Sequence, residues 1–429
     1  MAYRFHENDQ FDHEIRMALG SVWWHGADVG EVLATSATVA GAGGETWFWT
    51  WAALGRRVRE QAERSASRGR RVTARDAFLR AAGYFALALA GAESCEDPQT
   101  RLREVFAEHR ACFDRFARAW DPPAERVAVP YEDTTLPGYL LGPPGPPGRL
   151  PTVIVNNGAA GAVSSAWTLL GAPAVARGYR ALLFDGPGQQ SMLFDRGVTF
   201  RPDWEKVVTP VVDLLSARSD VDAGRIALAG VGQAGYWVPR ALAFEHRIAA
   251  AVADPGVVAV VESWWHSLGP EVRGLWDSGD RDAFDHVVRE ALAADPALAA
   301  RWRGRARPYG VYSPYDLLAE IGRYDVTPVA ARITTPLLIT MPEGERLWPG
   351  ASRRLYDALP GPKALVCFTE AEGAQLHGEP MGRAVFEQRI FDWLDARLAP
   401  GPPDPSGRPG TGTGTGTGTG AQGGGVPGA

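Results

Sequence analysis

Arg225-Ile-Ala-Leu-Ala-Gly230-Val-Gly232-Gln233-Ala234-Gly235 is the segment from which the architecture of this chain can be inferred. Its apolar first half predicts a short buried strand, and the small residues after it predict a sharp turn into a helix. This is the context in which a G-x-S-x-G motif presents a nucleophilic serine, but the central residue is Gly232, which has no side chain. The segment is therefore either not such a turn, or one without covalent serine catalysis.

Composition narrows the class of protein. The chain has 429 residues, of which 45% are hydrophobic and 22% charged, which is typical of a globular protein. A net charge of -6 gives no reason to expect nucleic acid or an anionic membrane surface as a partner. The sequence shows no basic-then-apolar leader, no run of membrane-spanning length and no metal-ligand spacing among its three cysteines. We expect a cytoplasmic protein without membrane, metal or cofactor, and a homodimer is left open.

Three regions follow one another along the chain. Residues 1–122 are rich in Ala, Arg, Glu and Leu at helical spacing and predict a helical domain. Residues 123–398 alternate apolar strands with helices, which predicts a mostly parallel sheet covered by helices, with a helical insertion at about 257–327. The Gly- and Thr-rich tail, 399–429, is of low complexity and is expected to be disordered.

The helical domain is unusually aromatic. Five of its tryptophans and one phenylalanine gather in two places: Trp23, Trp24, Trp47, Phe48, Trp49 and Trp51. They fit helix packing, and they also fit a wall over a bulky apolar substrate.

A nucleophile at a strand-to-helix turn is followed along the chain by an acid and then a histidine. His377 comes after the last predicted strand and before the last predicted helix, which favours a catalytic imidazole. The acid is expected after the preceding strand, where Glu345 is preferred to Glu343 because it lies further along the loop. Asp254, at the end of another strand, is a third candidate.

Backbone N–H groups are the expected donors to an oxyanion. One would come from Gln233, directly after the turn, and another from the Asn156–Ala160 loop, in which Gly158 and Ala159 are the candidates. Asp185 is expected to hold its loop through backbone hydrogen bonds. The nearby hydroxyl groups belong to Ser164, Ser165 and Ser191, and none of these residues lies at the turn.

Several motifs taken together resemble one family. They are Asn156-Asn157-Gly158, Phe184-Asp-Gly-Pro-Gly-Gln189, Gly230-x-Gly232-x-x-Gly235-Tyr-Trp, Asp254-Pro-Gly and the His377 loop. The chain resembles, from about Asp9 to Arg397, the α/β-hydrolases related to 2,6-dihydroxypseudooxynicotine hydrolase and the fermentation-respiration-switch esterase-like group. The resemblance implies an α/β-hydrolase fold whose helical N-terminal cap domain covers the active site. That family includes enzymes that cleave carbon–carbon bonds in aromatic ketones.

The chain departs from this family at three positions. Gly232 replaces the serine nucleophile, Gln190 replaces the second glycine of a Gly-Gln-Gly loop, and Met341 stands where relatives often carry an acidic residue. Loss of a nucleophile typically costs several powers of ten in rate, on the order of 10⁴ or more, which argues against an ordinary esterase.

We therefore expect an atypical enzyme in which His377, oriented by Glu345 or Asp254, performs acid–base catalysis on an enolisable or aromatic carbonyl substrate. The reaction would form or cleave a carbon–carbon bond, in natural-product metabolism, on an apolar or aromatic small molecule. Two alternatives are a hydrolase in which His377 activates water, and a non-catalytic pseudohydrolase that binds a ligand.

Overall fold

The computed structural model describes residues 3–145 and 148–399. The predicted low-complexity tail, 399–429, lies outside the described residues except for Ala399.

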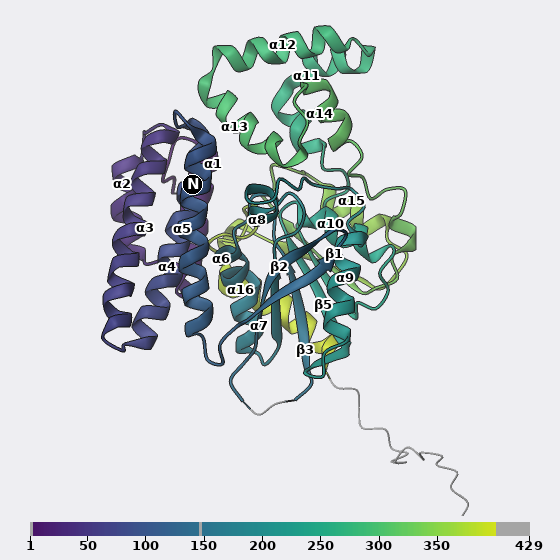
Figure 1. Ribbon diagram of the computed structural model, residues 1–429. Helices are drawn as coiled ribbons and strands as arrows, with labels where there is room; N and C mark the ends of the chain where they lie inside the picture. The colour runs from purple at the N-terminus through teal and green to yellow at the C-terminus, as the bar shows by residue number, and fades with distance from the viewer. Residues whose placement is uncertain (1–2, 146–147, 400–429) are drawn as a thin grey trace, which may run out of the picture. The chain divides into compact units, whose positions relative to one another are not determined.

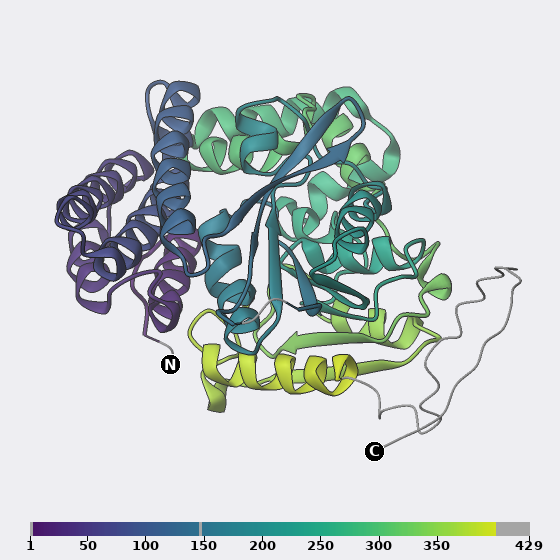
Figure 2. The same cartoon turned by 60° about the horizontal axis from the view of Figure 1, so that its bottom comes forward.

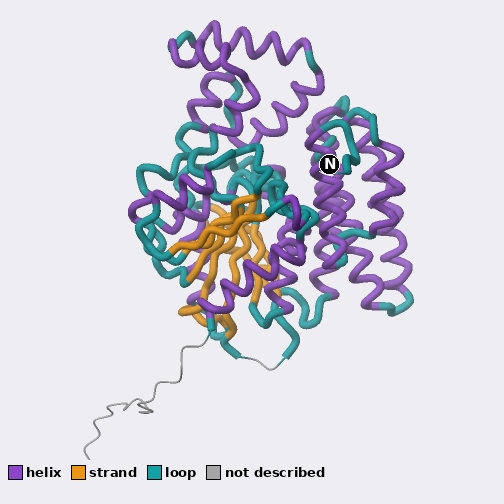
Figure 3. The backbone as a smooth tube through the Cα atoms, turned by 180° about the vertical axis from the view of Figure 1, so that it is seen from behind, coloured by secondary structure: helices purple, strands orange, loops and turns teal. Residues whose placement is uncertain are grey.

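One sheet forms the centre of the molecule. Its eight strands run in the order β1-β2-β4-β3-β5-β6-β7-β8; β1 pairs antiparallel with β2, β2 pairs antiparallel with β4, and all other pairs are parallel. This confirms the prediction of a mostly parallel sheet covered by helices (Figure 3). The strands are β1 Glu125–Tyr131, β2 Thr134–Leu141, β3 Leu150–Asn156, β4 Arg180–Phe184, β5 Val221–Val231, β6 Ala250–Asp254, β7 Leu337–Pro342 and β8 Lys363–Phe368.

Helices cover both faces because the parallel strands are apolar on both sides. In β3, Val153 and Val155 pack into the core cluster shared with the N-terminal helices, whereas Ile154 packs into the opposite cluster. Figure 2 shows the last helix (yellow) beside the sheet. The covering helices are α6 Val163–Ala166, α7 Ala172–Ala176, α8 Gln190–Phe194, α9 Glu205–Ser216, α10 Ala234–Leu242, α15 Ala351–Ala358 and α16 Arg383–Leu398.

The helix expected at 164–177 is interrupted. Residues Trp167–Gly171, between α6 and α7, form a π-helical segment. Pro173 has no N–H to donate to the carbonyl of Leu169, four residues earlier, and the buried guanidinium of Arg383 donates to that carbonyl instead (Nη2–O 2.8 Å). The carbonyl of Leu169, which Pro173 leaves without the usual helical donor, thus holds the side chain of Arg383 in place.

The N-terminal region forms a layered set of helices beside the core (Figure 1). Side-chain caps define several of its ends: Asn8 accepts from the N–H groups of Gln10 and Phe11, and Asp97 caps a helix that begins with Pro98. Of the aromatic groups, Trp47, Phe48 and Trp51 are fully buried, whereas Trp23 and Trp49 are exposed. The helices are α1 Asp9–Ser21, α2 Val29–Val39, α3 Gly44–Ser67, α4 Arg71–Leu89 and α5 Pro98–Ala119.

Four further helices lie between β6 and β7, over the end of the sheet at which β5 leads into α10 (Figure 1). The first of them bends at Gly269, whose φ is 77°, directly before Pro270. These insertion helices are α11 Glu262–Ser278, α12 Arg281–Ala294, α13 Pro296–Ala306 and α14 Pro314–Ile321.

Candidate active site

The turn between β5 and α10 has the geometry of a nucleophile elbow. Gly232 has a φ of +65°, its N–H donates to the carbonyl of Asp254 (2.6 Å), and its carbonyl accepts from Gly235 (2.9 Å). A Cβ at Gly235 would lie 1.8 Å from the carbonyl oxygen of Pro255, so only glycine allows α10 to approach this closely. The turn is therefore built as tightly as one that presents a serine.

The space above Gly232 is open. A Cβ built on this glycine would lie 3.6 Å from Nε2 of His377 and 3.8 Å from Cα of Gly158, with no other described atom within 4 Å apart from Gly232 and its two chain neighbours. A side chain at this position would thus lie next to an imidazole nitrogen. The surroundings leave room for a serine side chain, although the φ of +65° favours glycine.

His377 is held by one carboxylate. Its Nδ1 lies 2.6 Å from Oε2 of Glu345, while Oε1 of Glu345 accepts from the N–H groups of Leu347 and Trp348 (2.7 and 3.1 Å). A carboxylate only accepts, so Nδ1 carries a proton, and in the neutral imidazole Nε2 presents a lone pair toward Gly232.

His377 and Glu345 shift each other's pKa in opposite directions. Burial lowers the pKa of His377, but the charge and hydrogen bond of Glu345 outweigh burial, and the net shift is upward from 6.5. Burial raises the pKa of Glu345, yet His377 and the two backbone donors bring it below its ordinary value. Glu345 is therefore ionised at neutral pH.

The other two candidate acids lie elsewhere. Glu343 is exposed, and its Oε2 accepts from the N–H of Glu370 (2.9 Å). Asp254 is fully buried at the end of β6, where its Oδ1 accepts from Thr340 Oγ1 (2.6 Å); burial raises its pKa. Asp254 supports the elbow through its carbonyl and acts on His377 only through its charge.

The candidate oxyanion donors differ in availability. The N–H of Gly158 donates to Oδ1 of its neighbour Asn157 (3.0 Å), so it is not free. Within 3–145 and 148–399, no acceptor is found for the N–H groups of Gln233 and Ala159. Gln189 fixes the loop by donating to the carbonyls of Asn157 and Gly158 (2.7 and 2.9 Å).

Serine hydroxyls near the site are engaged by other groups. Oγ of Ser164 lies 3.2 Å from Nε2 of His109, on α5. Ser191 donates through Oγ and N–H to Asp185, which also pairs with Arg110 of α5. Asp185 thus holds its loop, as expected, and in addition links α5 to the core.

Comparison with known proteins places the chain. It is 30% identical over 420 residues to the α/β-hydrolase xenA of Xenoacremonium sinensis, an alignment that covers 92% of this chain and 97% of the relative. The chain belongs to the α/β-hydrolase family.

Other relatives of this α/β-hydrolase are also named hydrolases. Hydrolase ORFZ of Pyricularia oryzae is 30% identical over 82% of this chain and 85% of the relative, and the 20-hydroxy-prefusarin hydrolase FUS2 of Gibberella moniliformis is 28% identical over 91% and 97%. The crystal structure of 2,6-dihydroxy-pseudo-oxynicotine hydrolase shares the fold, with a TM-score of 0.70 at 21% identity over 89% of this chain and 95% of that one. No family model matches the sequence.

The N-terminal helices of this α/β-hydrolase bring a second histidine to the site. The rings of His13, on α1, and His377 have centroids 6.0 Å apart. Burial, followed by the charge of His377, lowers the pKa of His13 to about 4, so its imidazole is neutral. Sequence reasoning missed this residue, because a lone histidine on an amphipathic helix carries no signal of what it faces.

A single glycine sets how closely α1 approaches the His377 loop. A Cβ at Gly20 would lie 1.7 Å from the carbonyl oxygen of Pro380, three residues after His377. Trp24, just beyond α1, donates to Oε1 of Glu387 in α16 (2.7 Å). The N-terminal helices are thus packed directly on the loop that carries the imidazole.

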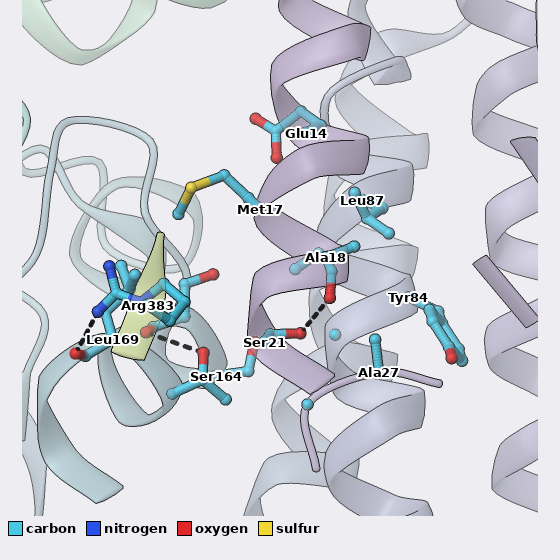
Figure 4. A pocket seen from close by; sticks show the side chains of 15 residues that line it. Glu14, Met17, Ala18, Ser21, Ala27, Tyr84, Leu87, Ser164, Leu169 and Arg383 are labelled. Atoms are coloured by element: carbon cyan, nitrogen blue, oxygen red, sulfur yellow. Dashed lines mark hydrogen bonds between the residues drawn. The ribbon is translucent and has the colours of Figure 1, made fainter. Parts of the chain in front are cut away.

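A cavity lies between α1, α4 and the core (Figure 4). It has a volume of about 50 Å³, and Figure 4 shows Glu14 and Met17 of α1 facing Arg383 and Ser164 across it. Burial raises the pKa of Glu14 to about 7. Arg383 also donates to the carbonyl of Gly378, next to His377 (3.4 Å), which ties the cavity wall to the His377 loop.

The described residues lack both a cluster of metal ligands and a membrane-spanning helix. Residues 3–145 and 148–399 contain no group of three or more His, Cys, Asp or Glu side chains able to hold a metal ion. In the same part of the chain, none of the helices has the length and apolar character needed to cross a membrane.

Proposed function

We propose that this protein is an α/β-hydrolase-fold enzyme that uses His377 as an acid–base catalyst on an enolisable or aromatic carbonyl compound, without an acyl-serine intermediate. One observation carries the proposal: Nε2 of His377, with Nδ1 bound to Glu345, faces the open position above Gly232. A substrate can occupy the space that a serine side chain would fill.

The arrangement supports a stepwise proton transfer. Nε2 removes a proton from the carbon next to the carbonyl group, and the N–H groups of Gln233 and Ala159 donate to the enolate oxygen. Glu345 stabilises the imidazolium. In bond formation the enolate carbon attacks a second carbonyl carbon, and the oxygen of that carbonyl takes the proton from the imidazolium. In cleavage Nε2 instead takes the proton of a β-hydroxyl group, the carbon–carbon bond breaks to give the enolate, and the imidazolium protonates the enolate carbon. The general base and the oxyanion donors are each worth roughly two to four powers of ten in rate.

The substrate would be a small molecule with apolar or aromatic parts. The cavity between α1, α4 and the core, which Arg383 connects to the His377 loop, combines apolar groups, such as Met17 and Leu169, with the polar groups of Glu14 and Arg383. The relative that is named for acting on 20-hydroxy-prefusarin supports a substrate from natural-product metabolism.

Hydrolysis by activated water is the second candidate, favoured because the relatives are named hydrolases. A water molecule above Gly232 would donate to Nε2 of His377 and attack a reactive carbonyl directly.

Hydrogen–deuterium exchange separates these functions. An aryl alkyl ketone is incubated in D₂O with the wild type or His377→Ala, and loss of its α-proton signal is followed by NMR. Exchange catalysed by the wild type alone supports enolate chemistry. No exchange, with His377-dependent uptake of ¹⁸O from labelled water into the acid released from an activated ester, supports hydrolysis. If neither occurs but ketone binding persists, the protein is a binder.

A mass-spectrometric comparison identifies the natural reaction. Pathway extract is incubated with each protein, and products formed only by the wild type are sought. An unchanged mass indicates isomerisation or cyclisation, whereas a gain of one water indicates hydrolysis.

A further inference from the structure

The insertion helices line a second cavity, separate from the one between α1, α4 and the core. It has a volume of about 130 Å³ and lies between α11, α12 and α13. Its walls are almost entirely apolar and include Trp264, Leu268, Val288, Leu292 and Trp302. None of its lining residues contributes to the His377 site.

Among the described residues, the charged groups that line this cavity are two arginines, Arg301 and Arg305. In the same part of the chain, neither lies within ion-pair distance of a carboxylate, whereas Arg273, Arg281, Arg289, Arg303 and Arg307 of the same insertion all do. The described lining of the cavity is therefore apolar except for two unpaired guanidinium groups.

Arg305 is fixed in place although it has no counter-ion. Its guanidinium lies over the ring of Trp264 (4.1 Å from Cζ to the centroid), and Nη2 donates to Oγ of Ser263 (3.3 Å). Burial lowers its pKa to about 10, so the group is still charged at neutral pH. A guanidinium group that is partly withdrawn from water without a counter-ion lowers the stability of the fold, and a ligand of opposite charge would offset this cost.

We propose that this cavity binds a free amphiphilic anion, with its carboxylate on Arg305 and its apolar chain between the two tryptophans and Leu292. The aromatic walls supply apolar contact, and the guanidinium selects the sign of the head group. The site is close to the elbow but distinct from it: the Trp264 ring lies 6.3 Å from the ring of Tyr309, whose hydroxyl donates to Oε1 of Gln233 (3.2 Å).

Three probes with the same ten-carbon chain test the proposal: decanoate, decan-1-ol and decyltrimethylammonium, titrated calorimetrically below their micelle concentrations. We expect the wild type to bind decanoate most tightly and the ammonium compound least. Arg305→Gln should weaken decanoate binding about tenfold and leave decanol within about twofold, because only the ionic contact is lost. Arg289→Gln removes an exposed arginine of α12 that pairs with Asp285 and does not line the cavity; it is the matched control and should change neither.

A second variant tests the cavity itself. Leu292→Trp fills the space and should abolish binding of all three probes while far-UV circular dichroism stays as in the wild type. Equal binding of the three probes would overturn the proposal, as would an equal loss of decanoate and decanol in Arg305→Gln, which would make Arg305 a packing group only. Binding to anionic vesicles in place of monomeric decanoate would overturn it too. His377→Ala should bind decanoate as the wild type does, so this result does not depend on the proposed function.

Discussion

His377 and His109 each face a position where a hydroxyl nucleophile can stand, and their surroundings are opposite. Among the described residues, His377 has a carboxylate on Nδ1 and faces Gly232 with Nε2, whereas His109 has the hydroxyl of Ser164 at Nε2 and a buried Nδ1 without a partner. The pKa of His377 is raised, but burial lowers that of His109 to about 3. The contrast predicts that the group on the far ring nitrogen, and not a neighbouring serine, decides which imidazole takes a proton.

Replacing each histidine by glutamine is the strongest test of this contrast. His377→Gln should lower turnover on the order of 10³-fold, because Nε2 of His377 is the described imidazole nitrogen within 4 Å of a Cβ built on Gly232. His109→Gln keeps a hydrogen-bonding group next to Ser164 and should change turnover by less than about threefold. Steady-state rates on the same substrate compare them. The reverse order of effects would move the active site to Ser164.

Removing the carboxylate of Glu345 should leave His377 in the situation of His109, with no acidic partner on Nδ1 and a pKa lowered by burial. An unprotonated base is required, so the rate rises with pH through the pKa of His377, which Glu345 holds above 6.5. In Glu345→Gln, burial is left to lower that pKa; the acidic limb of the pH–rate profile should move to lower pH, and the maximal rate should fall on the order of 10²-fold. Glu343→Gln is the matched control. A limb that stays in place would rule out Glu345 as the partner.

Adding the missing hydroxyl tests the elbow. Gly232→Ser should become labelled by a fluorophosphonate at position 232, while the wild type, including Ser164, stays unlabelled; intact-mass and peptide analysis measure this. Gly232→Ala controls for backbone strain, since any side chain at a φ of +65° costs on the order of 1 kcal/mol of unfolding free energy. Labelling of Ser164 in the wild type would contradict the contrast drawn above.

The smallest expected effect concerns Glu14, whose pKa is raised by burial alone. It tests how burial changes the stability of a carboxyl group that has no ion-pair partner among the described residues. Burial raises its pKa from 4.5 to about 7, so the stability contributed by its neutral form is present below pH 4.5 and lost as pH rises through about 7. Glu14→Gln should therefore be more stable than the wild type at pH 8 by about 1 kcal/mol, a value reduced for partial exposure, and should match it near pH 4. Thermal unfolding at the two pH values measures this, and an equal difference at both would contradict it.

Much of the architecture could be predicted from local pattern. Runs such as Thr152–Asn156 and Arg225–Gly230 are strands because apolar residues without helical spacing are bounded by glycine, and their alternation with helices determines a parallel sheet. The position of His377 followed from the order of these elements. The preference for Glu345 over Glu343 rested on loop length alone; the structure adds that two backbone N–H groups fix its carboxylate.

What could not be predicted depends on contacts between distant segments. His109 meets Ser164 from 55 residues away, and His13 meets His377 from the opposite end of the chain. A carbonyl of the π-helical segment beside Pro173 accepts from a guanidinium that the sequence places in the last helix. The engagement of the Gly158 N–H by Asn157 is a matter of loop conformation, which composition does not reveal.

The contact between Gly20 and Pro380 restricts how the molecule can open. Because α1 touches the backbone three residues beyond His377, any swing of the N-terminal helices away from the core would remove the support of that loop. An opening at α1 therefore cannot admit substrate without disturbing the site: with the helices parted, the His377 loop would lose the contact that helps to hold the imidazole over Gly232. A substrate that arrives while the base is aligned has to pass another way, and a chimera that exchanges residues 9–119 would need a glycine at position 20.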